Sequence, residues 1–298
     1  MAVIILLGAG ASFGSGGVEP YAPPLGNELF GELEKLGGEA AAIPSNIKKT
    51  FKENFEAGMA EYYEYTNGDI MSFQRELASY LASFQPLDDN IYLQLIKALP
   101  RQRVIFSSLN YDLLLELSAS KLGLTTNYST RHNNKSIRLL KIHGSSNFWP
   151  DIPPGIDIRG AKFSGSKGAD IETDVKPLNQ VQTLQKCSTD THLSPAISMF
   201  AEGKQVKVCS EYVKYQYDMW LEQVKKSSKI FIIGVRVHQI DEHIWKVLGE
   251  CKATITYFGF PKDSIEFDEW KASHGKKNAY FCTSDFKNSI ETIKARAR

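Results

Sequence analysis

The sequence predicts an α/β fold, in which a Rossmann-like, doubly wound parallel sheet carries helices on both faces. Short apolar runs rich in β-branched residues alternate with segments of helical periodicity as far as the C-terminus, and two of these runs break at glycine. The chain has 298 residues, and 42% of them are hydrophobic, which is ample for a packed interior. We therefore expect a single domain over residues 1–298, with a helical insert at about 45–100 and an irregular segment at about 149–195.

The first apolar run predicts a phosphate-binding turn. Val3–Leu7 is long enough for a buried strand, and it stops at Gly8-Ala9-Gly10. Gly8 would allow a sharp turn, and Gly10 would let the backbone approach a pyrophosphate. A dinucleotide fingerprint has Gly or Ala three residues after the second glycine, where this chain has Phe13. A turn without a ligand therefore remains open at this point.

The next segments predict a loop and then helices. Gly14–Pro24 is rich in Gly, Ser and Pro, which is typical of a flexible connection, and Asn27 can cap a helix that ends at Gly37. Within the insert, Phe51, Phe55, Met59 and Tyr63 recur every four residues, and so do Phe73, Leu77 and Leu81. These patterns predict a helical hairpin, followed by a third helix over Asp89–Leu99, with the aromatic residues in its core.

Polar residues follow the next two apolar runs. Val104–Phe106 leads to Asn110 and Asp112, and Ile137–Ile142 leads to His143. Open α/β sheets bind ligands at the carboxyl ends of their strands, so these residues are site candidates. Two plainer explanations compete: Asp112 can cap the helix that Leu113–Leu122 predicts, and His143 can be a structural histidine.

The remaining runs complete the alternation of strands and helices. Beyond the irregular segment, the patterns predict helices at 212–224, 241–250, near Asp268 and from Asp285, and strands at 229–233, 253–258 and 278–282. The strand at 229–233 breaks at Gly234, as the first strand breaks at Gly8.

Composition excludes several classes of function. A net charge of +1 with interspersed signs gives no general attraction to nucleic acid or to anionic lipid. No apolar run approaches membrane length and no basic segment precedes the first one, so we expect a cytoplasmic protein. The four cysteines include no C-x-x-C pair, so we expect reduced thiols and no bound metal.

Five fragments in order resemble the NAD-binding core of the sirtuins, most closely the bacterial sirtuin-like branch of antiphage defence. They are Gly8-Ala-Gly-Ala-Ser12, Asn110-Tyr-Asp112 with Leu114-Leu115-Glu116, Lys141-Ile-His-Gly-Ser145, Ser194–Phe200, and Ile232-Ile-Gly-Val235 with Asp241. The resemblance covers most of the chain, without the insert and the irregular segment.

The resemblance implies roles for individual residues. Gly8, Ala9, Gly10 and Ser12 would hold the NAD phosphates, Asn110 and Asp112 would bind at the nicotinamide ribose, and His143 would be the catalytic base. Phe13 and Gly234 are further candidates for cofactor binding. Cleavage of the nicotinamide–ribose bond passes through an oxocarbenium-like centre, which an amide and a neutral imidazole can serve. Asn110 and His143 are therefore the catalytic candidates, and we expect both outside the core.

The activity that the resemblance implies is NAD hydrolysis to nicotinamide and ADP-ribose, in abortive antiphage defence. The four-cysteine zinc module of protein-deacylating sirtuins is missing from the sequence, which places acyl-lysine hydrolysis in doubt. A metal-free deacylase or ADP-ribosyltransferase, and a non-catalytic sensor of NAD or ADP-ribose, stay open. We also expect a homo-oligomer, with the aromatic face of the insert as a contact surface between copies or with a partner. The resemblance suggests a HerA-type ATPase or a short Argonaute as that partner.

Overall fold

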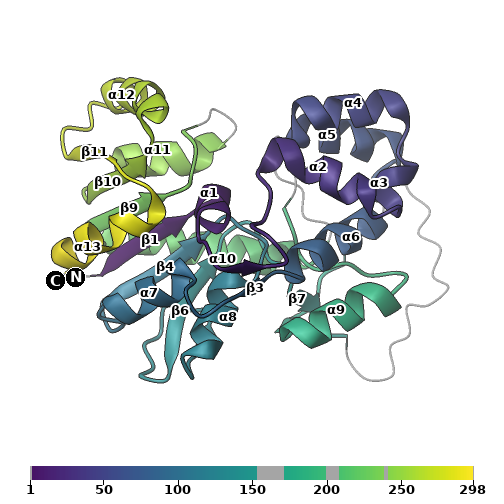
Figure 1. Cartoon of the computed structure of the whole chain (residues 1–298), viewed down its shortest axis with the longest axis horizontal. Coiled ribbons are helices and arrows are strands. Elements are labelled where there is room, and N and C mark those ends of the chain that lie inside the picture. The colour runs from purple at the N-terminus through teal and green to yellow at the C-terminus, as the bar shows by residue number, and fades with distance from the viewer. Residues whose placement is uncertain (1, 153–170, 199–207, 238–240, 298) are drawn as a thin grey trace.

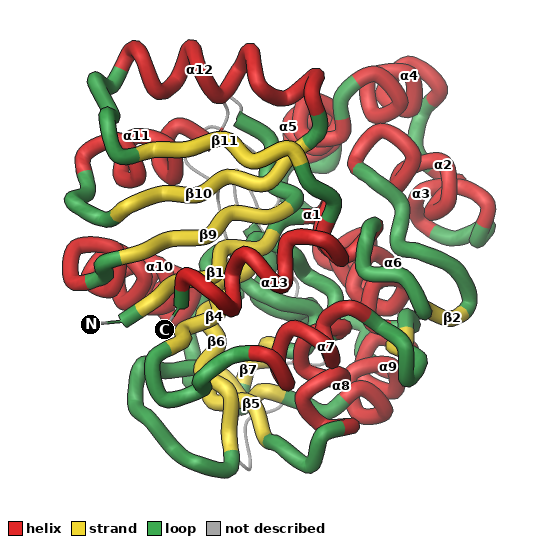
Figure 2. The backbone as a smooth tube through the Cα atoms, turned by 60° about the vertical axis from the view of Figure 1, so that its left-hand side comes forward, coloured by secondary structure: helices red, strands yellow, loops and turns green. Residues whose placement is uncertain are grey.

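The computed structural model describes residues 2–152, 171–198, 208–237 and 241–297. A central sheet of seven parallel strands has the order β11-β10-β9-β1-β4-β6-β5 (Figure 2). Its strands are β1 (Val3–Leu7), β4 (Val104–Ser108), β5 (Thr125–Asn127), β6 (Ser136–Lys141), β9 (Lys229–Ile233), β10 (Thr254–Gly259) and β11 (Ala279–Thr283). Apart from the added edge strand β5, the sheet winds outward from β1 in both directions, as in a Rossmann fold. The predicted fold class is confirmed.

Helices cover both faces of the sheet. They bury β1, whose side chains are apolar on both sides. Val3, Ile5 and Leu7 pack in one core and Ile4 and Leu6 in the other. The first core includes residues of α7 (Ile91–Ala98), α8 (Leu114–Lys121) and α13 (Phe286–Arg296). The second includes residues of α10 (Ser210–Lys226), α11 (Glu242–Glu250) and α12 (Ser264–Ser273).

The helical insert lies beside the sheet (Figure 1). It takes in more than the expected start at about 45, because α2 (Gly26–Lys35) and α3 (Glu39–Ala42) pack with α4 (Ser45–Glu53), α5 (Phe55–Tyr65) and α6 (Met71–Ala82). The four-residue pattern from Phe51 to Tyr63 is not one helix: Asn54 has φ −153°, and its side chain caps α5 by accepting from Ala57 N at 3.0 Å. The cap predicted at Asn27 is also wrong, because α2 already begins at Gly26. The third predicted helix, α7, packs against α8 and α13 on the sheet.

Aromatic rings fill the centre of the insert. The Phe51 ring stacks on Phe30 with centroids 4.3 Å apart, and the Phe73 centroid lies 5.6 Å away. Tyr62 and Tyr63 are also buried, whereas Tyr65 is 64% exposed. The aromatic residues of the insert are thus mainly core. The exposed aromatic surface available to a partner is therefore smaller than the sequence suggests.

Two segments expected to be irregular contain regular contacts. In the loop after β1, β2 (Val18–Glu19) pairs with β3 (Gln85–Pro86), and Asn90 Nδ2 donates to Gly16 O at 2.6 Å. The described part of 149–195 holds an antiparallel pair, β7 (Phe148–Pro150) and β8 (Val175–Pro177), and α9 (Gln180–Thr189). The rest of that segment, 153–170, lies outside the described residues. In the described parts of the chain, no helix is both long and apolar enough to cross a membrane.

Candidate functional site

The glycine turn after β1 lies against the end of β9. Gly8 N donates to Ile233 O and Gly10 N to Gly234 O, both at 3.0 Å. A Cβ on Gly8 would lie 2.4 Å from Gly234 O, and one on Gly234, where φ is +65°, would lie 2.0 Å from Ala11 N. The two backbones meet where the sheet changes its winding direction, which is the binding position in open α/β sheets. The glycines are therefore required by this contact, whether or not a phosphate binds.

The residues of α1 (Ala9–Phe13), a single helical turn, divide between solvent and interior. Ala9 is exposed, and Phe13 is 46% exposed. Ser12 is buried and faces the strand ends, where its hydroxyl contacts three polar side chains. Of the candidates in this turn, only Ser12 thus belongs to a side-chain network.

The Ser12 hydroxyl uses its full hydrogen-bonding capacity. It donates to Asp112 Oδ2 at 2.7 Å and accepts from Asn110 Nδ2 at 2.9 Å. Tyr92 OH lies 3.0 Å from the same oxygen and must be the donor, because the serine has only one proton to give. Burial raises the pKa of Tyr92 well above its ordinary value, so the phenol keeps that proton. Ser12, Tyr92, Asn110 and Asp112 thus form one hydrogen-bonded network.

Asp112 serves both the network and the start of a helix. Its Oδ1 accepts from Leu114 N, the first amide of α8, at 3.0 Å, as predicted for a residue that satisfies the helix start, although the cap position itself is Leu113. Lys141 Nζ donates to the Asp112 carbonyl at 2.7 Å and lies 3.3 Å from Glu116 Oε1. Burial raises the pKa of Glu116, and the attraction of Lys141 opposes that rise. A buried cation thus supports the backbone that presents Asp112.

Asn110 holds the glycine turn. Besides its bond to Ser12, its amide Nδ2 donates to Gly8 O at 2.9 Å. Only 8% of Asn110 and 5% of His143 is exposed, so the expectation that both lie outside the core is wrong. Their burial follows from the segments that cover the strand ends, which apolar patterning of the strands does not reveal.

His143 belongs to a different group, the histidine cluster His143–Asp241–His243. The Nε2 atoms of the two histidines are 3.1 Å apart, and one ligand atom from each of the three residues lies within 4.8 Å of the others. In the sheet, β1 and β4 stand between β9, which precedes Asp241 and His243, and β6, which precedes His143. The cluster therefore joins the two halves of the sheet across its carboxyl edge.

The backbone of the cluster is held on both sides. Ser198 N donates to the His143 carbonyl at 2.9 Å, and Tyr217 OH donates to the His243 carbonyl at 3.1 Å. Gly144, with φ +81°, turns the chain directly after His143, and a Cβ there would lie 2.1 Å from Ala196 O. Both rings thus project from constrained positions.

Sequence reasoning predicted part of each group. It found Ser12, Asn110 and Asp112 but not Tyr92, and it found His143 but gave no role to Asp241 and missed His243. The Asp-x-His spacing at the start of a predicted helix was a usable signal for His243. Tyr92 gave none, since an aromatic residue in an apolar helix is ordinarily core.

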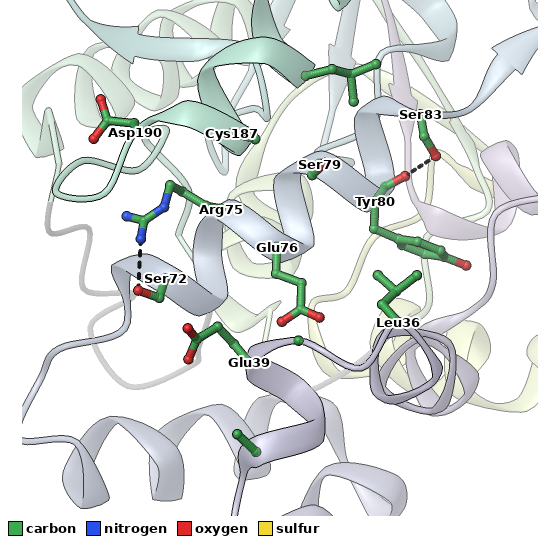
Figure 3. A pocket seen from close by; sticks show the side chains of 13 residues that line it. Leu36, Glu39, Ser72, Arg75, Glu76, Ser79, Tyr80, Ser83, Cys187 and Asp190 are labelled. Atoms are coloured by element: carbon green, nitrogen blue, oxygen red, sulfur yellow. Dashed lines mark hydrogen bonds between the residues drawn. The ribbon is translucent and has the colours of Figure 1, made fainter.

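A cavity of about 640 Å³ lies elsewhere, between the insert and α9 (Figure 3). Arg75 projects along its wall and donates to Ser72 Oγ at 2.9 Å, and Glu76 Oε2 accepts from Ala40 N at 2.9 Å. Burial raises the pKa of Glu76, and it raises that of Cys187 to about 12, which makes Cys187 a thiol rather than a nucleophile. Among its described lining residues are none of the site candidates from the sequence.

Two comparisons, with protein families and with curated proteins, add no assignment to this geometry. No protein-family model matches the chain, and no curated protein sequence matches it significantly.

Proposed function

We propose that the protein is an NAD glycohydrolase, which converts NAD and water to nicotinamide and ADP-ribose. One observation carries the proposal: Asn110 and His143 follow the neighbouring strands β4 and β6, at the sheet edge where the glycine turn lies. Ligands of open α/β sheets bind at this edge. The described parts of the sirtuin-like fragments meet at the same edge, which supports NAD as the ligand.

The residues divide the proposed chemistry. The glycine turn holds the pyrophosphate side of NAD, Ser12 supports that turn, and Asn110 and Asp112 position the nicotinamide ribose. The bond between ribose C1′ and the nicotinamide nitrogen breaks, and nicotinamide leaves with the bonding electron pair. A water oxygen then bonds to C1′, and the proton that this water loses passes to the His143 imidazole as the base.

A non-catalytic sensor of NAD or ADP-ribose is the second candidate, because of one specific observation. The Asn110 amide holds Gly8 and Ser12, and the Ser12 hydroxyl has no donor left for a ligand. These groups act as supports for the turn, which suffices for a protein that binds the nucleotide without cleaving it.

The test is nicotinamide release from NAD by the purified full chain, read by chromatography with and without an acetylated peptide. Asn110→Ala and His143→Ala should each reduce release by more than about 100-fold, the usual scale for a lost acid–base or positioning group. Release that requires the peptide would instead identify a deacylase.

Two matched variants control for general damage. Asn278→Ala removes another amide that holds two backbone carbonyls, those of Lys252 and Ala253, before β10. His132→Ala removes an exposed histidine on the loop before β6. Both lie at the amino edge of the sheet, so both should keep full activity. NAD binding without release, lost in Asn110→Ala, would favour the sensor. Abortive antiphage defence, self-assembly and a partner ATPase or Argonaute remain proposals that depend on the activity.

A further inference from the structure

The spacing of the histidine cluster fits a shared metal ion. In a tetrahedral site with Zn–N bonds of about 2.0–2.1 Å, two nitrogen ligands lie about 3.3 Å apart. The His143 and His243 Nε2 atoms are 3.1 Å apart, which lies close to that value. A hydrogen bond between two imidazoles fits the same distance. The distance alone therefore permits a metal site, and the third residue must decide.

Asp241 adds a carboxylate to the two imidazoles. A hydrogen bond between two histidines does not require this carboxylate, whereas a metal site uses it as a third ligand. One of the Asp241 carboxylate oxygens lies within 4.8 Å of one ring nitrogen of each histidine. Two imidazoles with one carboxylate form the donor set of catalytic zinc sites and of the non-haem iron triad, and the carboxylate offsets part of the charge of the cation. Asp241 and Glu242 also counter the positive end of α11, which would otherwise repel a cation.

We propose that His143, Asp241 and His243 bind one first-row divalent transition-metal ion, with Zn²⁺ as the ion that the donors suit best. The missing cysteine pairs do not bear on this site, because its two histidine ligands come from segments 100 residues apart. His143 is constrained by Gly144 and Ser198, and His243 by Tyr217, so the two imidazole ligands are held before the ion arrives.

A bound ion has a consequence for NAD cleavage, and this part rests on the proposed function. An imidazole nitrogen that coordinates a metal cannot take a proton from water at the same time. Zn²⁺ at the cluster should therefore inhibit nicotinamide release, and a chelator should restore it. The cluster then works as a metal-dependent brake on the proposed hydrolase.

The binding test uses Co²⁺ as probe, because tetrahedral Co²⁺ absorbs visible light. We expect the metal-free full chain to bind one Co²⁺, which Zn²⁺ displaces, and Zn²⁺ to raise the melting temperature. His243→Ala and Asp241→Asn should each weaken binding more than about 10-fold and lose the thermal shift. The control His132→Ala should bind as the wild type does, because this exposed histidine precedes β6 whereas His143 follows it.

Two outcomes overturn the site: a wild-type chain that binds no stoichiometric Co²⁺, or a folded His243→Ala chain that binds as tightly as the wild type. Asp241 and His243 are only half-buried, so their variants should fold, and melting curves without metal verify this. Nicotinamide release is measured separately. A chain that binds metal but releases no nicotinamide even when it is metal-free refutes the hydrolase and leaves the site, whereas release without metal binding does the reverse.

Discussion

The carboxyl edge of the sheet and the helical insert are both buried, but they are held together by different contacts. At the sheet edge, backbone packs directly on backbone at Gly8, Gly10 and Gly234, and polar side chains satisfy one another around Ser12. In the insert, aromatic rings pack around Phe51. Backbone contacts cannot yield to an added atom, whereas side chains can repack. The edge should therefore be intolerant of added volume, and the insert should be sensitive to lost volume.

The largest effect is expected for Gly234→Ala. Its added Cβ would lie 2.0 Å from Ala11 N, in a residue with φ +65°. We expect a loss of more than about 4 kcal/mol in the free energy of unfolding, measured by urea denaturation, or failure to fold. Gly275→Ala is the matched control, because φ is +57° but nothing lies within 4 Å of the added Cβ. It should cost only about 1–2 kcal/mol. Equal losses would mean that the edge can yield.

Phe51→Ala tests the insert by removing volume. The ring is fully buried between Phe30 and Phe73, so the expected loss is about 3–5 kcal/mol. Tyr65→Ala removes an exposed aromatic residue of the same insert and should change stability by less than about 0.5 kcal/mol. A comparable loss in both variants would show that Tyr65 is covered in solution, as self-association would require.

Asn110→Ala removes polar contacts from the sheet edge without adding volume. Loss of the bonds to Gly8 O and Ser12 Oγ should cost about 2 kcal/mol, because buried partners stay unsatisfied. Asn278→Ala also removes two bonds, to Lys252 O and Ala253 O, but at a half-buried position, and should cost about 1 kcal/mol. If Asn110→Ala were as stable as the wild type, the amide would not support the turn.

The smallest expected effect is a change in the pH dependence of stability through Glu76, which lines the cavity beside the insert. Burial raises the pKa of Glu76 above its ordinary 4.5, so its contribution to stability is complete below 4.5 and is lost as pH rises through the folded-state pKa. Glu76→Gln should remove this loss and raise stability at pH 7 by under about 1 kcal/mol, since solvent partly screens the group.

Glu34→Gln should change the pH dependence of stability in the opposite direction to Glu76→Gln. Hydrogen bonds from Lys52 and Lys48 lower the pKa of Glu34, so its contribution is present above 4.5 and is lost as pH falls. Urea denaturation from pH 4 to pH 7 should therefore show the two variants departing from the wild type in opposite directions. Shifts of the same sign would contradict the burial of Glu76.

The sequence predicted the sheet better than the site. Buried parallel strands are continuous apolar runs, so β1 was predicted at Val3–Leu7, where the structure has it. Periodicity did not reveal the break at Asn54, because the apolar spacing continues across it. The Ser12 network and the histidine cluster depend on side chains that meet across long sequence separations. Local patterns could identify candidates such as Asn110 and His143, but not Tyr92, which reaches Ser12 from another helix.

The span of the histidine cluster has a consequence for the order of folding. His143 and His243 are 100 residues apart, and they meet only when the strands on both sides of β1 have joined the sheet. Closing so long a loop costs chain entropy, which later packing must offset. We expect the cluster to form after the transition state for folding, so its mutation should speed unfolding and leave the refolding rate nearly unchanged. A partly folded chain would then lack the complete cluster, and a nascent polypeptide would lack it until β9 and α11 are in place.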